Sequence, residues 1–223
     1  MQFLVAWTAA WLSSRYPDSR YPDSPSAQER PGPATLVGES IGGSIALTLA
    51  ARAHPRVARV VAVNPYDYYG GRGIRRASPV AEILFRLAPV PVLGETVFRL
   101  RNPLVERSVF EGGVRRPDSF PGTLRRELSR VGNRRGYHQA FLSLVRHWAS
   151  WEAVRQEYGK IDRPALLIYG EYDWSREPER EANRRAIPDN RSLVLPGAGH
   201  FLSVEAPGEL VEAVTGFAGR GHR

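Results

Sequence analysis

The sequence predicts an α/β fold, a mostly parallel sheet flanked by helices that carries a helical insertion. Residues 57–64 (VARVVAVN) and 164–169 (PALLIY) are continuous apolar runs of strand length, as expected for strands that helices cover on both faces. Helix-like segments alternate with these runs, which is typical of a parallel sheet. The long stretch between the two runs is rich in arginine, glycine and proline and has helical patterning.

Length and composition indicate one globular domain, or one domain with a sizeable insertion. The 223 residues are 42% hydrophobic and 24% charged, which argues against a largely disordered chain. The chain has no cysteine. This excludes a disulfide framework, a thiolate zinc site, an iron–sulfur cluster and a cysteine nucleophile.

The net charge of +8 raises the question of nucleic-acid binding. All but one of the 31 basic residues are arginines, and they are scattered instead of forming a basic tract interleaved with aromatic residues. We therefore expect no nucleic-acid partner. The apolar segment 1–12 is too short to span a bilayer and lacks the features of a signal peptide, which predicts a cytoplasmic protein without stable membrane insertion.

Residues 1–33 are expected to form an apolar segment followed by a linker. The first twelve residues (MQFLVAWTAAWL) fit either a short helix or a buried strand. Residues 13–33 contain a tandem repeat, RYPDS at 15–19 and again at 20–24, together with prolines that disfavour helix and strand. We interpret them as a mobile linker.

A strand–turn–helix pattern follows the linker. Residues 34–37 form a short apolar run that enters the sequence GESIGG. Residues 44–54 have a helical pattern that ends before Pro55. The second strand is expected at 57–64.

The rest of the chain is expected to be mainly helical up to residue 159 and then to return to strands. The predicted helices are 80–88, 95–110, 121–130, 137–147 and 150–158. Strands are expected at 164–169 and 192–195, each running into a glycine-containing turn, and a last amphipathic helix at 205–218.

Ser40 is the candidate nucleophile. Residues 38–42 (GESIG) fit the G-x-S-x-G pattern and lie between a predicted strand and a predicted helix, which is the context this pattern requires. Such a serine sits on a strained, tight turn, so the neighbouring positions must be nearly free of side chains. We expect Gly38, Gly42 and Gly43 to meet this need.

The helix after the serine is expected to contribute to the chemistry. It directs its N-terminal dipole and free N–H groups at the place where an oxyanion would form. The backbone N–H of Ile41 is the expected oxyanion donor. The alternative interpretation is a glycine-rich turn whose serine has no catalytic role.

Asp173 is the candidate acid. It stands just past the strand 164–169, and the carboxyl edge of a parallel sheet is where such folds place their sites. A carboxylate there would fix the imidazole tautomer and stabilise the imidazolium. Asp67, which follows the preceding strand, is the alternative acid, and a turn or helix-capping role is the alternative for Asp173.

His200 is the candidate general base, because it lies in a glycine loop between a strand and the last helix. The other histidines precede a proline, lie in the helical region or end the chain (His54, His138, His147 and His222). The order Ser40, Asp173, His200 agrees with the serine–acid–histidine order of one class of hydrolases. No H-x-x-H, H-E-x-x-H or G-x-x-x-x-G-K-[ST] pattern occurs, so we expect neither a metal nor a cofactor.

Three motifs together resemble the α/β-hydrolase superfamily over about residues 34–218. They are LVGESIGGSIALTLAARAHP around Ser40, LLIYGEYDWS around Asp173 and LPGAGHFLSVEAP around His200. The resemblance implies that Ser40 is the nucleophile, His200 the general base and acid, and Asp173 the residue that orients it. The serine is similar to that of esterases and lipases and argues against haloalkane dehalogenases, which have aspartate there.

The resemblance also implies a domain organisation. Residues 34–69 and 160–223 correspond to the hydrolase core, and residues 70–159 resemble the helical cap that covers the active site in this family. Aromatic residues of this region are candidates to line a pocket, although such residues more often belong to the core (Tyr66, Tyr68, Tyr69, Trp148 and Trp151).

The sequence departs from the family pattern at its start. The family has four strands before the nucleophile strand, and a loop after the third supplies a second oxyanion donor, often as His-Gly. Residues 1–33 are too short for these elements, and no His-Gly precedes Ser40. We therefore expect an N-terminally truncated fold whose exposed sheet edge favours homo-oligomers.

The expected function is that of a serine hydrolase acting on a small-molecule carboxylic ester or related acyl substrate through an acyl-enzyme on Ser40. The alternative is a catalytically impaired, hydrolase-like binding module that lacks the second oxyanion donor.

Overall fold

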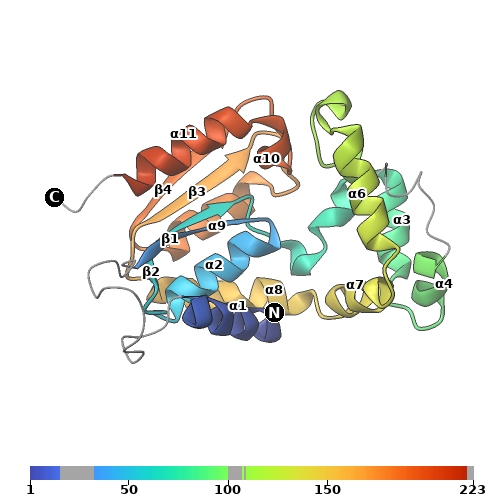
Figure 1. The fold of residues 1–223 in the computed structure, drawn as a ribbon, viewed down its shortest axis with the longest axis horizontal. Coiled ribbons are helices and arrows are strands. Elements are labelled where there is room, and N and C mark those ends of the chain that lie inside the picture. The colour runs from blue at the N-terminus through green and yellow to red at the C-terminus, as the bar shows by residue number, and fades with distance from the viewer. Residues whose placement is uncertain (16–32, 100–106, 108, 220–223) are drawn as a thin grey trace.

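Four parallel strands form a single sheet in the order β1-β2-β3-β4 (Figure 1). The computed structural model describes residues 1–15, 33–99, 107 and 109–219. The strands are β1 (Ala34–Glu39), β2 (Val57–Val63), β3 (Ala165–Gly170) and β4 (Asn190–Leu195). A parallel sheet flanked by helices confirms the predicted fold class.

The two central strands are mostly apolar because helices cover both faces of the sheet; the exception is the half-buried Arg59 of β2. Val60 and Ala62 of β2 point into one apolar cluster, and Val61 and Val63 point into another. Successive side chains of a strand alternate between the faces, so a strand covered on both sides needs an apolar residue at every position.

Helices from both ends of the chain cover the sheet. On one face α2 (Ile41–Ala51) contributes Leu47, and α1 (Gln2–Arg15) packs against α2 through buried residues that include Val5. The same cluster includes Ile187, directly after α9 (Glu177–Ala186). The other face is covered by α10 (Leu202–Glu205) and α11 (Pro207–Ala218). Residues 1–12, which fit helix or strand equally, are therefore helical.

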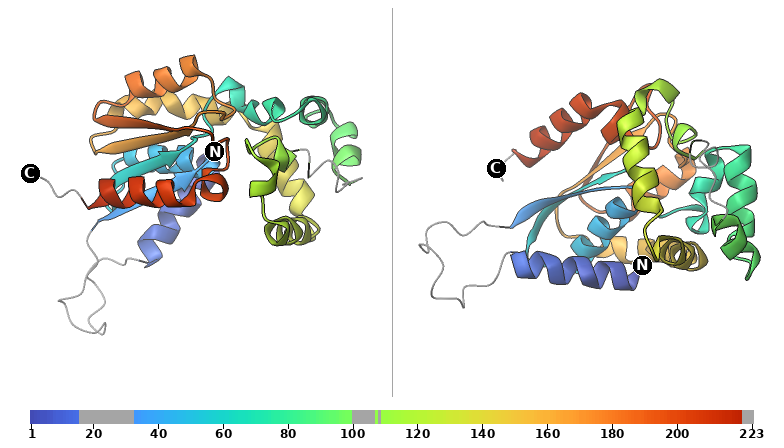
Figure 2. Two further views of the ribbon diagram at one scale, coloured as in Figure 1. Left: turned by 90° about the horizontal axis from the view of Figure 1, so that it is seen from above. Right: turned by 45° about the vertical axis from the view of Figure 1, so that its right-hand side comes forward.

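A second group of helices lies beside the carboxyl ends of the strands (Figures 1 and 2). Its α-helices are α3 (Pro79–Leu87), α4 (Leu93–Arg99), α6 (Gly122–Gly132), α7 (Tyr137–Arg146) and α8 (Ala149–Ala153). Short 3₁₀ turns connect them at 69–71, 73–76, 117–119 and 154–160. The helical character predicted for this region is thus confirmed, and the assignment of 70–159 as a cap stays a prediction.

Several predicted boundaries are wrong. The helix expected at 205–218 begins at Pro207, because Pro207 excludes the preceding residue from the α region and Ala206 takes φ −138° and ψ 51°, which separates α11 from α10. The helix expected at 150–158 is α-helical only to Ala153 and continues as a 3₁₀ turn.

The helix expected at 44–54 also differs. It begins at Ile41 and ends at Ala51, because the chain turns before Pro55 with φ 52° at Ala53.

Two further predictions fall wholly or partly on residues that the structure does not describe. The helix expected at 95–110 is helical to Arg99 and then enters undescribed residues. The linker expected at 13–33 is wrong at its start, because residues 13–15 are the last turn of α1, and its residues 16–32, with most of the repeat, lie outside the described residues.

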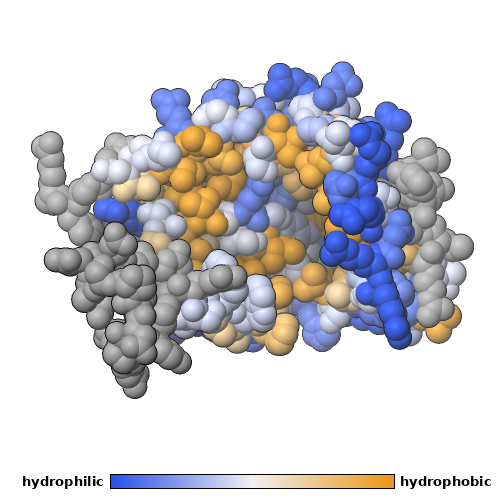
Figure 3. Space-filling model, viewed as in Figure 1, coloured by the Kyte–Doolittle hydropathy of each residue, from blue (hydrophilic) through white to orange (hydrophobic). Residues whose placement is uncertain are grey.

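The strand β1 forms one edge of the sheet, and β2 is its partner among the described residues. Val37 on β1 is 46% exposed. Figure 3 shows apolar surface over this edge, between α11 and α1. No helix in the described ranges combines the length and apolarity that crossing a bilayer requires.

Candidate active site

Ser40 stands on a strained turn between β1 and α2. Its φ of 56° and ψ of −121° lie in a region that residues other than glycine rarely adopt. The Ser40 N–H donates to the carbonyl of Val63 (2.9 Å), and its carbonyl accepts from the N–H of Tyr66 (3.0 Å). These bonds tie the turn to the end of β2, so the neighbouring strand helps to hold the unusual backbone geometry that a nucleophile elbow needs.

Close packing excludes a side chain at one of the three glycines around Ser40 and leaves little room for one at a second. A Cβ on Gly38 would lie 2.1 Å from the carbonyl oxygen of Gly42, and one on Gly43 would lie 3.2 Å from the Cα of Pro65. A Cβ on Gly42 would meet no described atom within 4 Å. The expectation that all three must lack side chains is therefore wrong for Gly42.

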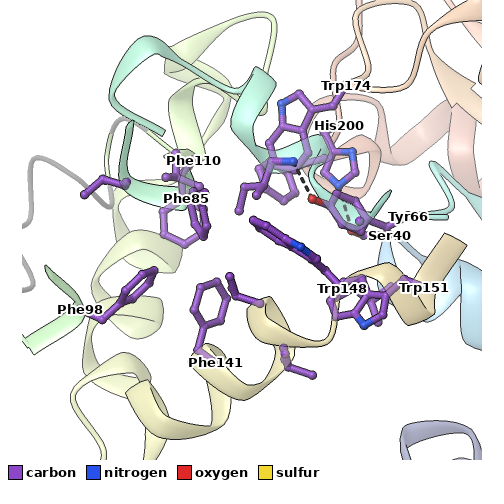
Figure 4. A pocket seen from close by; sticks show the side chains of 18 of the residues that line it. Ser40, Tyr66, Phe85, Phe98, Phe110, Phe141, Trp148, Trp151, Trp174 and His200 are labelled. Carbon is purple, nitrogen blue, oxygen red and sulfur yellow. Dashed lines mark hydrogen bonds between the residues drawn. The ribbon is translucent and has the colours of Figure 1, made fainter. Parts of the chain in front are cut away.

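The structure brings Ser40, His200 and Asp173 into one hydrogen-bonded chain. The Ser40 Oγ lies 2.9 Å from Nε2 of His200, and Nδ1 of His200 lies 2.5 Å from Oδ1 of Asp173. Figure 4 shows Ser40 and His200 side by side at one end of a pocket. These side chains come from the ends of β1, β3 and β4, which meet at the same edge of the parallel sheet.

The second oxygen of Asp173 is also bonded. The backbone N–H of Ser175 donates to Oδ2 at 3.0 Å, and the Ser175 hydroxyl also bonds to this oxygen. Burial by itself raises the pKa of Asp173, but His200 and the Ser175 hydrogen bonds outweigh it and lower this pKa below its ordinary value. Asp173 is therefore ionised at neutral pH, as a residue that orients an imidazole must be.

The alternative acid, Asp67, makes different contacts. Its buried carboxylate accepts hydrogen bonds from the Tyr158 hydroxyl (2.8 Å) and from the Asn183 side-chain amide (3.1 Å). Burial raises the pKa of Asp67 to about 6. The acid bonded to the His200 ring is Asp173.

Aromatic rings enclose the imidazole of His200, which is only 1% exposed. The Trp174 indole stacks on it with 3.9 Å between ring centroids and 12° between planes. Tyr66 and Phe201 meet it edge-on, at 6.1 and 5.3 Å. The only sequence signal for this stacking is the position of Trp174 next to Asp173.

Asn64 is a second residue that sequence reasoning missed. Its buried side chain donates to the carbonyls of Gly199 (3.1 Å) and His200 (2.8 Å) and accepts from the N–H of Gly170 (2.9 Å). It therefore ties together the ends of β2, β3 and β4 below the histidine. Its only sequence signal is its place directly after an apolar strand.

A pocket of about 260 Å³ opens in front of Ser40, between the sheet and the second group of helices (Figure 4). Phe85, Phe98 and Phe141 form a ring cluster in its wall, with centroids 5.4 to 6.0 Å apart. Among the described residues that line it, none is an aspartate, glutamate, lysine or arginine. Of the aromatic candidates, Tyr66, Trp148 and Trp151 line the pocket, whereas Tyr68 and Tyr69 are not among its lining residues.

Ile41, the expected oxyanion donor, lies at the start of α2. Ile41 is the first residue of α2, so its N–H has no acceptor within the helix, and its residue lines the pocket beside Ser40. Within the described ranges, no group of three or more histidine, aspartate and glutamate side chains is arranged to hold a metal ion.

This fold, with a serine at the turn after its first strand, defines an α/β hydrolase. The family model described as "Alpha/beta hydrolase family" matches residues 6–213. The chain therefore belongs to the alpha/beta hydrolase family.

Individual relatives share this fold. The chain is 25% identical over 186 residues to the sn-1-specific diacylglycerol lipase ABHD11 of Mus musculus, a match that covers 83% of this chain and 59% of the relative. Haloalkane dehalogenase DbeA from Bradyrhizobium elkani is similar in structure, with a TM-score of 0.69, 20% identity and coverage of 83% of this chain and 67% of that one. The meta-cleavage product hydrolase CumD from Pseudomonas fluorescens has a TM-score of 0.62, 17% identity and coverage of 82% and 64%. The chain thus spans about three fifths of the curated relative's length.

Proposed function

We propose that the protein is a serine hydrolase in which Ser40, His200 and Asp173 form the catalytic triad. The observation that carries this proposal is the continuous chain of hydrogen bonds from the Ser40 hydroxyl through His200 to Asp173. A serine hydroxyl is a weak nucleophile at neutral pH and needs an adjacent, oriented base to become reactive. The strained turn supports the same role because it presents the serine in front of the pocket.

The proposed reaction has two halves. In the first, Ser40 Oγ attacks the carbonyl carbon of an ester while Nε2 of His200 takes the hydroxyl proton, and the Ile41 N–H donates to the oxyanion. The tetrahedral intermediate expels the alcohol, which leaves with the proton from His200, and an acyl-enzyme remains. In the second half, water attacks the acyl group, His200 takes a proton from the water and returns it to Ser40 Oγ, and the carboxylic acid is released.

The pocket favours an uncharged, apolar acyl or alcohol group. Its lining offers aromatic and aliphatic side chains, so a charged group inside it would lose its hydration without gaining a counter-ion. A cavity of about 150 Å³ holds a benzene molecule. A pocket of about 260 Å³ therefore has room for a ring with a short chain, or for an alkyl chain of medium length. The curated relative's name describes a lipase, which supports an ester as the substrate class.

Hydrolysis of a series of p-nitrophenyl acyl esters tests the proposal. We expect turnover by the wild type, no turnover above background by Ser40→Ala, and a preference for apolar acyl groups over charged ones. Ser44→Ala is the matched control, because Ser44 is buried in α2 four residues after Ser40 and its hydroxyl has no hydrogen-bond partner among the described residues. A folded wild type that hydrolyses none of the esters would favour the alternative, a hydrolase-like module that binds an apolar ligand.

A further inference from the structure

The carboxylate of Glu205 is buried between the loop that carries His200 (residues 196–201, called the histidine loop below) and the second group of helices. It is the last residue of α10, is 7% exposed, and lies five positions after His200. Its Oε2 accepts the N–H of Gly199 at 2.6 Å. Its Oε1 accepts the N–H groups of Arg115 and Arg116 at 2.8 and 2.9 Å. One carboxylate thus joins the residue before the candidate base to a segment about 85 positions earlier in the chain.

The same segment meets the histidine loop through its backbone. The carbonyl of Gly113 accepts the N–H of His200 at 2.6 Å and that of Phe201 at 3.3 Å. A Cβ on Gly113 would lie 2.2 Å from the Phe201 ring, and one on Gly199 would lie 2.7 Å from the Gly113 oxygen. The two backbones therefore approach as closely as glycine allows.

The carboxylate has a role here that a neutral side chain cannot fill. Two oxygens receive three backbone N–H groups, and a fourth bond comes from the Ser119 hydroxyl at 3.4 Å. A glutamine would present an NH₂ group to at least one of these donors. Hydrogen bonds to a charged group are stronger than those between neutral groups.

We propose that Glu205 is a positioning residue that couples the docking of segment 112–119 to the placement of His200. When this segment is docked, Glu205 and Gly113 accept hydrogen bonds from N–H groups of the histidine loop, while Asn64 donates to a carbonyl of the same loop. When the segment lifts, Gly199 and His200 lose these partners together. The base is then in place only when the helices that form the pocket wall are closed over the site. The catalytic consequence rests on the proposed function, whereas the coupling itself does not.

Docking is measured first, without reference to activity. Trypsin cuts after Arg115 only if the backbone at 115–116 leaves Glu205, and Pro117 protects the next bond. In a Ser40→Ala background we expect Glu205→Gln to speed this cut at least fivefold, as followed by mass spectrometry of the tryptic peptides that end at Arg115 or begin at Arg116. Glu171→Gln is the matched control, because Glu171 is exposed and its side chain accepts the N–H of Gly197 in the same loop (2.9 Å), with no hydrogen bond or ion pair to segment 112–119.

The placement of His200 is measured on the same samples. The proton between Nδ1 of His200 and Asp173 gives a low-field ¹H NMR resonance when the two side chains are bonded. We expect Glu205→Gln to broaden or remove it and Glu171→Gln to leave it. In the Ser40-containing protein, labelling by a fluorophosphonate should slow roughly tenfold in Glu205→Gln, as expected for losing a hydrogen bond to a charged group.

Gly113→Ala tests the coupling from the other side and serves if Glu205→Gln does not fold. Its Cβ should undock the segment while Glu205 is intact, so it should speed the cut and weaken the resonance together. The coupling is overturned if only one of the two measurements, the cut or the resonance, changes in a folded variant, or if neither changes. A wild type that shows both the protected bond and the resonance but takes no label contradicts the proposed function and leaves the coupling supported.

Discussion

The indole of Trp174 lies face to face with the imidazole of His200, 3.9 Å away. Its Nε1–H also donates to the carbonyl of Gly112 at 3.0 Å. Trp174, which follows Asp173, therefore fixes the plane of the His200 ring. The bond to Gly112 holds the Trp174 side chain itself in place. Both ring nitrogens reach their partners in this stacked orientation, so ring packing contributes to the geometry of the site.

Replacing Trp174 tests this contribution. We expect Trp174→Leu to slow fluorophosphonate labelling roughly 2- to 10-fold, because an aromatic pair is worth about 0.5–1.5 kcal/mol beyond its buried area. Trp174→Phe keeps a ring against His200 and loses the bond to Gly112, so it should lie between leucine and the wild type. Leucine labelling at the wild-type rate would show that the stacking does not position His200.

Asp67 should make stability depend on pH. Its pKa in the folded protein is raised by burial to about 6, above the value near 4 of an unfolded aspartate, so the folded state holds a proton more tightly. The free energy of unfolding should therefore fall as pH rises from about 4 to 6, by about 3 kcal/mol at most. Asp67→Asn removes this dependence, and its amide has a ready acceptor in Oδ1 of Asn183, which has no partner among the described residues.

Denaturant unfolding of the wild type and Asp67→Asn at pH 4, 5, 6 and 8 measures the difference. The stability of the variant relative to the wild type should rise with pH up to about 6 and then level off. A constant difference across this range would mean that Asp67 titrates normally.

Gly38 and Gly42 form a matched pair on either side of Ser40. Gly38→Ala should destabilise the protein by at least about 3 kcal/mol, because its Cβ would fall 2.1 Å from the Gly42 oxygen, a backbone atom that cannot move aside freely. Gly42→Ala adds a methyl group in open space within α2 and should be neutral or stabilise by up to about 1 kcal/mol. Thermal melting of both variants measures these changes in stability. Equal losses of stability at the two positions would contradict the packing described for this turn.

The edge of β1 is expected to support self-association with a second copy of the chain. Val37→Lys places a charge on this edge and should shift the protein toward the monomer in sedimentation-velocity runs. Leu193→Lys, on the strand at the opposite edge, is the control and should leave the distribution unchanged. A wild type that is monomeric at all concentrations rules the association out.

The sequence reveals the parts of this site that depend on local geometry. The turn around Ser40 needs glycines at fixed offsets. Asp173 and His200 lie three and five residues after the ends of β3 and β4, in turns whose sequence marks them. The helix boundary at Ala206 is also predictable from the local sequence, because Pro207 excludes Ala206 from the helical region. Substrate, location and the absence of a nucleic-acid partner stay predictions.

Contacts between distant segments leave no such local pattern. Glu205 looks like an ordinary helical acid until the fold brings segment 112–119 against it, and Asn64 looks like a turn residue until three strand ends meet around it. The hydrogen bonds of Asp67 with Asn183 and Tyr158 likewise depend on where α9 and the 3₁₀ turn at 154–160 pack. Residues that hold the site are thus harder to predict than residues that form it.

Fluorophosphonate labelling of the purified protein, read by intact mass beside Ser40→Ala and with circular dichroism on both, tests the catalytic assignment most directly. The hydrogen-bonded chain from Ser40 to Asp173 predicts one adduct on the wild type and none on the variant. A wild type that is folded and takes no label, or a variant that labels equally, would contradict the assignment of Ser40 as the nucleophile.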